Sequence, residues 1–232
     1  MVSRASSQRG DLLEVRRDSW LSDVLGFAVY EGDGPGGERP SLTYAKIGVD
    51  DTEEVARLTA TGFSVVDVNV TYAYGDGTWP EPSNVEVAAP EHGDALIDIA
   101  GRCFRFSRFH LDPLIPNELA DRVKREWIRS YVEGRRGSEL LAAVDDGAPL
   151  GFLAVLEDGD SRIIDLVGVA PEAQGRGVGR ALVTAFVARH HAPGRKLLVG
   201  TQIANVPSVR LYESVGFSLT GAAYVLHLHR GA

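Results

Sequence analysis

A glycine-rich segment, VAPEAQGRGVGRAL at residues 169–182, carries the strongest chemical signal in the chain. It lies between an apolar run that predicts a strand and an amphipathic run that predicts a helix. Glycine lets a backbone approach a ligand closely, and the dipole at a helix start favours negative charge. The segment is therefore a candidate cradle for a pyrophosphate. The residues that would present backbone N–H groups to it are Gln174, Gly175, Arg176, Gly177, Val178 and Gly179.

The spacing of these glycines excludes several other phosphate-binding motifs. The run G-R-G-V-G lacks the G-x-G-x-x-G spacing of dinucleotide-binding folds, and no Gly-Lys-Ser/Thr follows it as in a Walker loop. The protein-kinase motifs are absent from the sequence as well. What remains is Gln-x-x-Gly-x-Gly after a strand that ends in Val-Ala-Pro. The alternative is a glycine-rich helix start that holds no ligand.

Charged residues in the second half could act on or bind a second substrate. Asp165 interrupts the apolar run 162–169, so it either accepts a proton through water in a cleft or pairs with a buried neighbour. Arg105 and Arg108 are three residues apart at the end of a predicted helix and could hold a nucleotide diphosphate. The alternative for both arginines is a solvated helix face.

The six histidines do not form a metal set in the sequence. His227 and His229 share a strand face, but no acidic residue is near them along the chain. A stable metal site usually needs three or four converging ligands. We therefore expect no metal.

These residues need a framework of strands and helices. Periodicity predicts strands at 139–145, 149–157, 162–169, 196–203 and 218–229, and helices after the glycine-rich turn and at 206–215. Nearer the N-terminus, a helix at 51–62 precedes an alternating strand that ends at Tyr74, and the Gly/Pro-rich run 75–83 predicts a linker. We therefore divide the chain into residues 1–83 and 84–232.

The two halves share a short internal similarity. VARLTATGFSVV, residues 55–66, resembles VRLYESVGFSLT, residues 209–220, when Gly62 is aligned with Gly216. Each copy predicts a helix, a glycine that ends it and a strand. Either two helix–turn–strand units are alike by coincidence, or the first half is a truncated copy of the second that lacks the glycine-rich turn.

Composition limits the class of protein. The chain has 232 residues, 44% of them hydrophobic, which is enough for a folded core. Its 24 Lys and Arg against 32 Asp and Glu give a net charge of −8, which argues against binding nucleic acid or an anionic membrane through bulk charge. One cysteine excludes an internal disulfide, and no run matches a signal peptide or a membrane span. We expect a cytoplasmic protein.

The turn and the order of elements around it resemble the GNAT family of N-acetyltransferases over residues 84–232. The resemblance implies an α/β (α+β) fold, with a mixed, mostly antiparallel central sheet flanked by helices and a smaller, truncated GNAT-like N-terminal half. It also implies acetyl-CoA as the co-substrate. Tyr212 would then be the general acid that protonates the coenzyme A sulfur; the alternative is a core tyrosine, because Val209, Tyr212 and Val215 share a helix face.

The same resemblance assigns the pantetheine arm of coenzyme A to two places. Asn205 would cap the 206–215 helix and also bind the arm. A main-chain N–H near Val167 would stabilise the oxyanion. The strand residues whose backbone would bind the arm are Leu166, Val167, Gly168 and Val169.

The acceptor follows from a narrower resemblance. Residues 201–217 and the triplet Ser107-Arg108-Phe109 are similar to a branch of the family that acetylates dTDP-4-amino-4,6-dideoxy sugars, which implies a nucleotide sugar as the small-molecule partner. A net charge of +3 over residues 101–140, against −9 over residues 41–100, favours an anionic acceptor. Two alternatives stay open: an acetyltransferase for a protein or antibiotic amine, and a non-catalytic acyl-CoA sensor. A homodimer is the oligomeric state that we consider.

Overall fold

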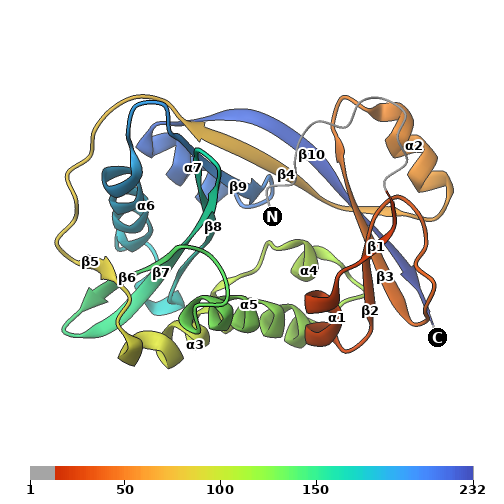
Figure 1. Ribbon diagram of the computed structural model, residues 1–232, viewed down its shortest axis with the longest axis horizontal. Helices are drawn as coiled ribbons and strands as arrows, with labels where there is room; N and C mark the ends of the chain where they lie inside the picture. The colour runs from red at the N-terminus through yellow and green to blue at the C-terminus, as the bar shows by residue number, and fades with distance from the viewer. Residues whose placement is uncertain (1–13, 232) are drawn as a thin grey trace.

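One mixed sheet runs through both halves of the chain. In the computed structural model, which describes residues 14–231, ten strands lie in the order β1-β2-β3-β10-β4-β9-β8-β7-β6-β5 (Figure 1). Neighbours are antiparallel except for two parallel pairs, β2 with β3 and β8 with β9. The expected mixed, mostly antiparallel sheet is confirmed. The strands are β1 (Arg16–Arg17), β2 (Ala28–Glu31), β3 (Ser41–Gly48), β4 (Ser64–Tyr74), β5 (Val85–Val87), β6 (Glu139–Asp145), β7 (Ala148–Asp158), β8 (Ser161–Val169), β9 (Lys196–Gln202) and β10 (Phe217–Arg230).

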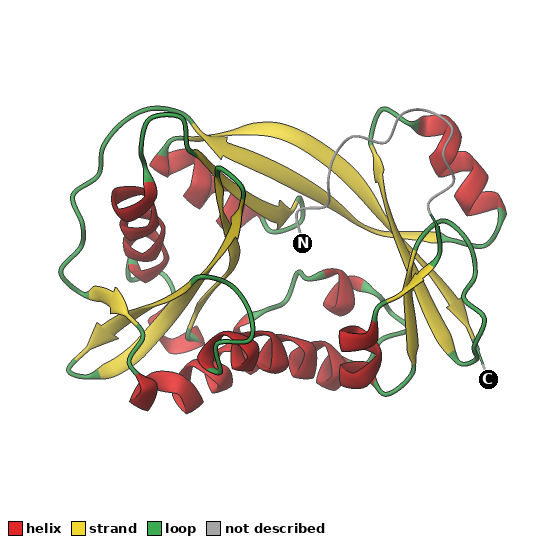
Figure 2. Cartoon of the chain, viewed as in Figure 1, coloured by secondary structure: helices red, strands yellow, loops and turns green. Residues whose placement is uncertain are grey.

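Helices flank this sheet (Figure 2). Gly151 of β7 faces Leu182, since a Cβ atom added to Gly151 would lie 3.3 Å from the Leu182 side chain. The side chain of the next residue, Phe152, lies near that of Cys103: a Cβ atom added to Gly168 would lie 2.7 Å from the Phe152 ring and 2.8 Å from the Cys103 sulfur. Consecutive strand residues face opposite sides, so the helices that carry Leu182 and Cys103 cover opposite faces. Among the described residues, none of the helices has the length and apolarity needed to span a bilayer. The helices are α1 (Ser19–Leu25), α2 (Thr52–Ala60), α3 (Gly93–Cys103), α4 (Arg108–Leu111), α5 (Asn117–Val132), α6 (Val178–His190) and α7 (Val206–Val215).

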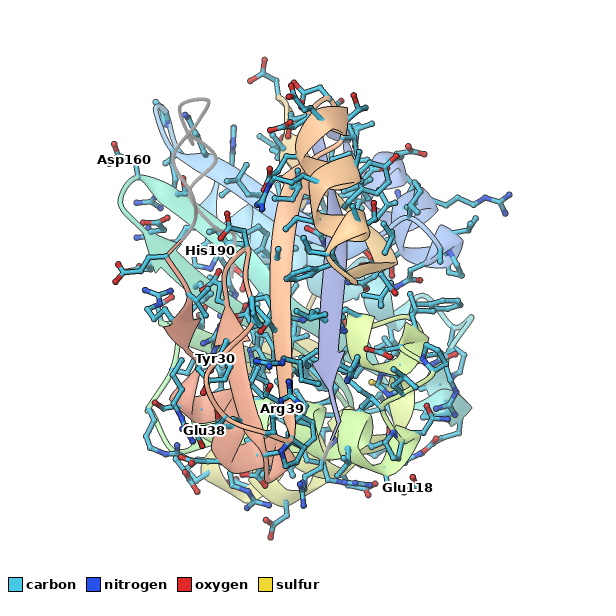
Figure 3. The ribbon with its side chains drawn as sticks, turned by 90° about the vertical axis from the view of Figure 1, so that its right-hand side faces the viewer. Tyr30, Glu38, Arg39, Glu118, Asp160 and His190 are labelled. Atoms are coloured by element: carbon cyan, nitrogen blue, oxygen red, sulfur yellow. The ribbon has the colours of Figure 1, made fainter. Side chains whose placement is uncertain are left out.

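The internal similarity corresponds to two interleaved units. In β3–α2–β4 and β9–α7–β10, the helix ends before a glycine with a left-handed φ, +99° at Gly62 and +106° at Gly216. The phenylalanine after each glycine, Phe63 or Phe217, is buried. Strand β10 lies between β3 and β4, and β4 lies between β10 and β9, so each unit places a strand inside the other. Figure 3 shows the side of the molecule that carries the N-terminal unit, with its side chains.

This interleaving changes how the two halves relate. The linker predicted at 75–83 is a largely irregular segment between β4 and β5. The sheet nevertheless continues across it, because β4 pairs with β9 and β10 of the second half. Without β4, both of those strands would expose unpaired backbone groups along an edge. The boundary between residues 83 and 84 is therefore a boundary along the chain and not in the sheet.

Helix α5 packs against both halves. Near its start, Ala120 and Val123 join a buried cluster with Leu21 of α1 and Leu42 of β3. Further along, Ile128 joins the main core formed with β6–β9 and α6. In Figure 1, α5 runs along the bottom of the molecule, opposite the long strands β4 and β10. It thereby fixes the N-terminal strands relative to the second half.

The sheet opens at the pair β8 and β9. In this parallel pair, Ser161–Ile164 of β8 are in register with Lys196–Val199 of β9, and the pairing ends there. The register of β8 with β7 shifts between Ile164 and Leu166, so Asp165 is the extra residue of a β-bulge. A bulge bends a strand and redirects its side chains. The ends of β8 and β9 are therefore free to line a pocket.

Candidate active site

A large cavity of about 810 Å³ begins where β8 and β9 separate. One side is formed by the ends of these strands, the glycine-rich turn and the start of α7; the other is formed by α1, α4, α5 and the N-terminal strands. Of the site residues predicted from the sequence, only Arg176 does not line it; the exposed Arg176 side chain lies 3.6 Å from Asp145. The predicted residues that line the cavity are Arg105, Arg108, Asp165, Leu166, Val167, Gly168, Val169, Gln174, Gly175, Gly177, Val178, Gly179, Asn205 and Tyr212.

The glycine-rich turn forms the start of α6. Gly175 and Gly177 have φ of +75° and +84°, a conformation that favours glycine, and Gly177 is the N-cap of α6. The amides in the first turn of a helix have no acceptor within that helix. The Gln174 side chain donates to the Val169 carbonyl over 3.2 Å, which ties the turn to the end of β8. The geometry is that of an anion-binding helix start on a cavity wall.

Tyr212 and Asn205 belong to α7. The Asn205 side chain accepts a hydrogen bond from the Ser208 amide at 3.3 Å, as expected for an N-cap. Tyr212 is 2% exposed, packs near Tyr72 and Phe217, and also lines the cavity. Burial raises the pKa of the Tyr212 phenol well above its ordinary value, so the hydroxyl keeps its proton at neutral pH. Its position is compatible with both the acid and the core interpretation.

Asp165 is held by three side chains. Its carboxylate accepts hydrogen bonds from Trp127 Nε1 and Tyr131 OH, both at 2.8 Å, and from two nitrogens of Arg136 at 2.8 and 3.2 Å. Burial opposes ionisation, but the hydrogen bonds from Arg136 and Trp127 outweigh it and lower the pKa of Asp165. The structure therefore has the buried pairing that the sequence left open as one of two alternatives.

Arg105 and Arg108 do not lie on one helix, contrary to the prediction. Helix α3 ends at Cys103 and α4 begins at Arg108, so Arg105 lies in the connecting segment, where it donates to the Phe104 carbonyl. A short α4 forms here because Ser107 caps it. The Arg108 guanidinium lies 3.8 Å from the centre of the Tyr44 ring, which fixes it on the N-terminal side of the cavity.

Several cavity residues escaped the sequence analysis because they come from the N-terminal half or from α5. Burial lowers the pKa of both Lys46 and Lys124 to about 8. Asp67 and Asn69 of β4 also line the cavity. The alternation of apolar and polar residues along β4 was the signal that could have found them. It shows that the polar residues share a face, although it does not show what covers that face.

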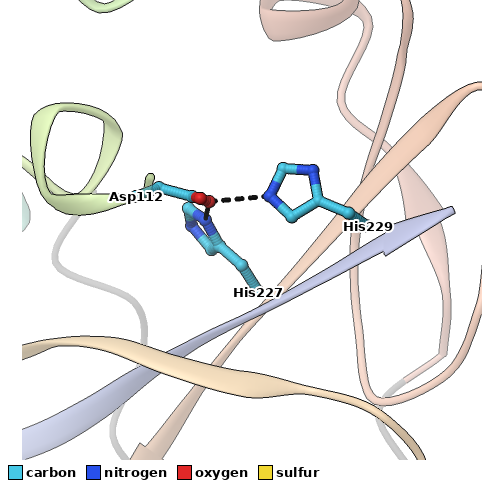
Figure 4. Close-up of side chains that lie close together, drawn as sticks. All are labelled: Asp112, His227 and His229. Atoms are coloured by element: carbon cyan, nitrogen blue, oxygen red, sulfur yellow. Dashed lines mark hydrogen bonds and ion pairs between the residues drawn. The ribbon is translucent and has the colours of Figure 1, made fainter. Parts of the chain in front are cut away.

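No acidic residue is near His227 and His229 along the chain, but the fold brings one to them. Asp112, just after α4, directs its carboxylate at both imidazoles (Figure 4). Its Oδ2 lies 2.6 Å from His227 Nδ1 and 2.7 Å from His229 Nε2. Two imidazoles and a carboxylate within 4.8 Å are also a donor set that a transition metal can accept. The two hydrogen bonds between Asp112 and these histidines hold the end of α4 against β10. They thereby also position the residues around Arg108.

Comparison with known proteins agrees with this geometry. The sequence model described as "Acetyltransferase (GNAT) family" matches residues 94–217. The chain is 31% identical to the spore coat polysaccharide biosynthesis protein SpsD of Bacillus subtilis, over 65% of this chain and 53% of that protein. It is 36% identical to a mycothiol acetyltransferase of Mycobacteroides abscessus, over 47% of this chain and 37% of that protein. The chain therefore spans about half the length of the first relative and just over a third of the second.

The fold is shared with solved structures as well. A GCN5-related N-acetyltransferase from Sphaerobacter thermophilus superposes with a TM-score of 0.60 at 18% identity. The match covers 83% of this chain and 61% of that chain. At this identity the likeness concerns the fold alone.

Proposed function

The chain belongs to the acetyltransferase (GNAT) family, and we propose that it transfers the acetyl group of acetyl-CoA to the amine of a dTDP-4-amino-4,6-dideoxy sugar. The observation that carries the proposal is one continuous cavity with two chemically different ends. One end has the glycine-rich helix start, and the other has cationic side chains from α4 and α5. Between them lie the separated ends of β8 and β9.

Coenzyme A fits the first end. The amides of residues 175–179 would bind its pyrophosphate, since Gly175 and Gly177 hold the left-handed conformations that a turn of this shape requires. The backbone of Leu166–Val169 and the Asn205 side chain would bind the pantetheine arm. These strand residues have room for it because β8 and β9 no longer pair beyond Ile164.

The chemistry requires a polarised thioester and an acid for the leaving thiolate. As the amine attacks, a C–N bond forms and an N–H near Val167 would stabilise the oxyanion. When the C–S bond breaks, its electron pair remains on sulfur, which takes a proton from Tyr212. The raised pKa of Tyr212 keeps that proton available at neutral pH.

The second end suits an anionic acceptor. Arg105, Arg108 and Lys124 line it, and a diphosphate is the group that paired guanidinium ions bind well. Arg129 and Arg135, from the same basic segment, are engaged instead with nearby glutamates. The name of the relative SpsD, a spore coat polysaccharide biosynthesis protein, also supports sugar chemistry.

Thiol release from acetyl-CoA tests this proposal. The acceptor panel is dTDP-4-amino-4,6-dideoxygalactose, its glucose isomer, a lysine peptide and an aminoglycoside, with dTDP as a blank. We expect release with an amino sugar and not with the peptide or the antibiotic. We expect Arg108→Ala to raise KM for the sugar about 10-fold, the loss of one charge-assisted hydrogen bond, and to leave KM for acetyl-CoA unchanged.

The matched control is Arg129→Ala, which removes an arginine whose partner is Glu126 on the surface of α5. It should change neither KM. Release with the peptide or aminoglycoside alone would favour the other acetyltransferase classes. No release with any amine, together with tight acetyl-CoA binding, would favour a sensor.

A further inference from the structure

Asp67 of β4 is a buried carboxylate in the cavity, and neither of its oxygens makes a well-formed hydrogen bond within residues 14–231; the Val68 amide and the Gln202 side chain are close enough only to favour its charged form. The residue is 6% exposed. Burying an ionised carboxylate without a partner is strongly unfavourable. A ligand group that fills its hydrogen-bonding capacity would remove that penalty.

The other carboxylates that line the cavity have partners. Asp18 accepts from the Leu21 amide and from the Tyr44 hydroxyl. Glu31 pairs with Arg16 at 2.8 Å, and Asp165 is held by Arg136. Among the cavity carboxylates of the described residues, Asp67 is therefore the one that makes no well-formed hydrogen bond or ion pair in the protein.

Asp67 lies between the two ends of the cavity. Val225 of β10 is in register with Lys46 of β3 on one side and with Asp67 on the other. Two residues further along β4, on the same face, Asn69 is in register with Gln202, the last residue of β9. All five residues line the cavity. Asp67 thus lies between the N-terminal acceptor side and the point where β8 and β9 have opened.

We infer that Asp67 binds the amine of the acceptor and takes the proton that its nitrogen loses during acetyl transfer. The inference rests on the proposed function and adds the base to it. As the C–N bond forms, one proton passes from nitrogen to the Asp67 carboxylate. As the C–S bond breaks, one proton passes from Tyr212 to sulfur. Exchange with water then returns both residues to their starting states, so protons balance over the cycle.

The charges around Asp67 suit a base. Burial raises the pKa of Asp67 to about 6, while the Val68 amide, Lys46 on β3, Arg108 on α4 and the Gln202 side chain act in the opposite direction. The carboxylate is therefore ionised above this pH and accepts a proton more readily than an exposed aspartate does. It also gives the neutral amine a charged hydrogen-bond acceptor in an otherwise cationic part of the cavity.

Asp67→Asn tests the inference, with dTDP-4-amino-4,6-dideoxygalactose as the acceptor. We expect kcat/KM for the sugar to be at least about 100-fold lower than in the wild-type protein. The decrease in kcat/KM that the wild-type protein shows below about pH 6 should be absent from the variant. The melting-temperature shift produced by acetyl-CoA should stay at its wild-type size. Because the substitution removes an unpaired buried charge, melting temperature should not fall. Asp33→Asn, the same change at a carboxylate outside the cavity that pairs with Arg57 at 3.0 Å, should stay within about twofold of wild type.

Asp67→Glu is a second variant in case Asp67→Asn does not fold. It keeps the negative charge, so its kcat/KM should be lower than that of the wild-type protein but should still decline below about pH 6. Wild-type kcat/KM in Asp67→Asn would overturn the inference and leave the proposed function standing. A lower kcat/KM with an unchanged pH profile would also overturn it, since the residue would then only position the sugar. No thiol release from the wild-type protein with either amino sugar would overturn both.

Discussion

Replacing Asp165 by asparagine tests the buried pairing in the cavity wall. The Asp165 side chain is 3% exposed, and Arg136 is 26% exposed. Asparagine keeps the shape but removes the charge that pairs with Arg136. Its NH₂ group must also face a donor: either Trp127 and Tyr131, which both donate to Oδ2, or the Arg136 nitrogen that donates to Oδ1. Removing one partner of a buried ion pair typically costs about 3–5 kcal/mol. Because water reaches part of Arg136, we expect the lower end, about 3 kcal/mol.

The measurement is thermal and urea unfolding without ligand. For a chain of this size, each kcal/mol lowers the melting temperature by about 2–4 °C, so a decrease of about 6–12 °C is expected. Glu172→Gln is the control. It makes the same chemical change in a carboxylate whose partner, Arg102, and whose own side chain are exposed. Its melting temperature should match that of the wild-type protein, because exposed pairs contribute little.

The same variant separates a structural from a catalytic role for Asp165. A structural role predicts lost stability and, at a temperature where the variant is folded, an unchanged pH profile of kcat/KM. An unchanged melting temperature together with a large fall in kcat would refute the reasoning from burial and hydrogen bonds. Asp165 would then be the residue that takes the amine proton.

Three further perturbations have defined outcomes. Tyr212→Phe should lower the single-turnover rate by about 10²–10⁴ and leave acetyl-CoA binding intact; an undiminished rate would leave the acid unassigned. Gly177→Asp should abolish the acetyl-CoA thermal shift, whereas Gly194→Asp, at a glycine with a similar φ of +79° in the loop before β9, should preserve it; loss of the shift in both would mean that backbone strain alone is responsible. Burial lowers the pKa of His227 to about 4, so between about pH 6.5 and 4 the unfolded chain takes up a proton first and stability should fall as pH falls. The free energy of unfolding, measured with urea across this range, should depend less steeply on pH in His227→Gln than in the wild-type protein. An equal pH dependence would contradict the assignment to His227.

Local signals predicted the coenzyme side of the site. The helix expected at 206–215 is α7, Val206–Val215, because Asn205 supplies the N-cap and Gly216 the left-handed C-cap. The turn before α6 was predicted for the same reason, since its glycines, the strand before it and the helix after it are neighbours in the chain. Features of this kind depend on residues within one or two turns of each other.

The internal similarity could be read from the sequence, but the interleaving of the strands of the two units could not. Gly62 and Gly216 each end a helix before a strand, as the alignment predicted. That β10 would lie between β3 and β4 depends on pairing between strands more than 140 residues apart, as for Tyr72 and Leu219. Such pairing is selected by the packing of whole faces, which no short motif encodes.

The sequence by itself determined the local parts of this protein: the glycine-rich helix start, the capped helix with Tyr212, and the polar face of β4. Tertiary structure decided what those parts surround. The alternation along β4 fixes that Asp67 and Asn69 share a face, but only the packing of α4 and α5 opposite that face makes it a cavity wall and not a solvated surface. Likewise, Asp112 reaches His227 across 115 positions because the fold brings the end of α4 to β10. Periodicity and capping act over a few residues, whereas a two-substrate site needs side chains from both halves to converge, and only long-range packing brings them together.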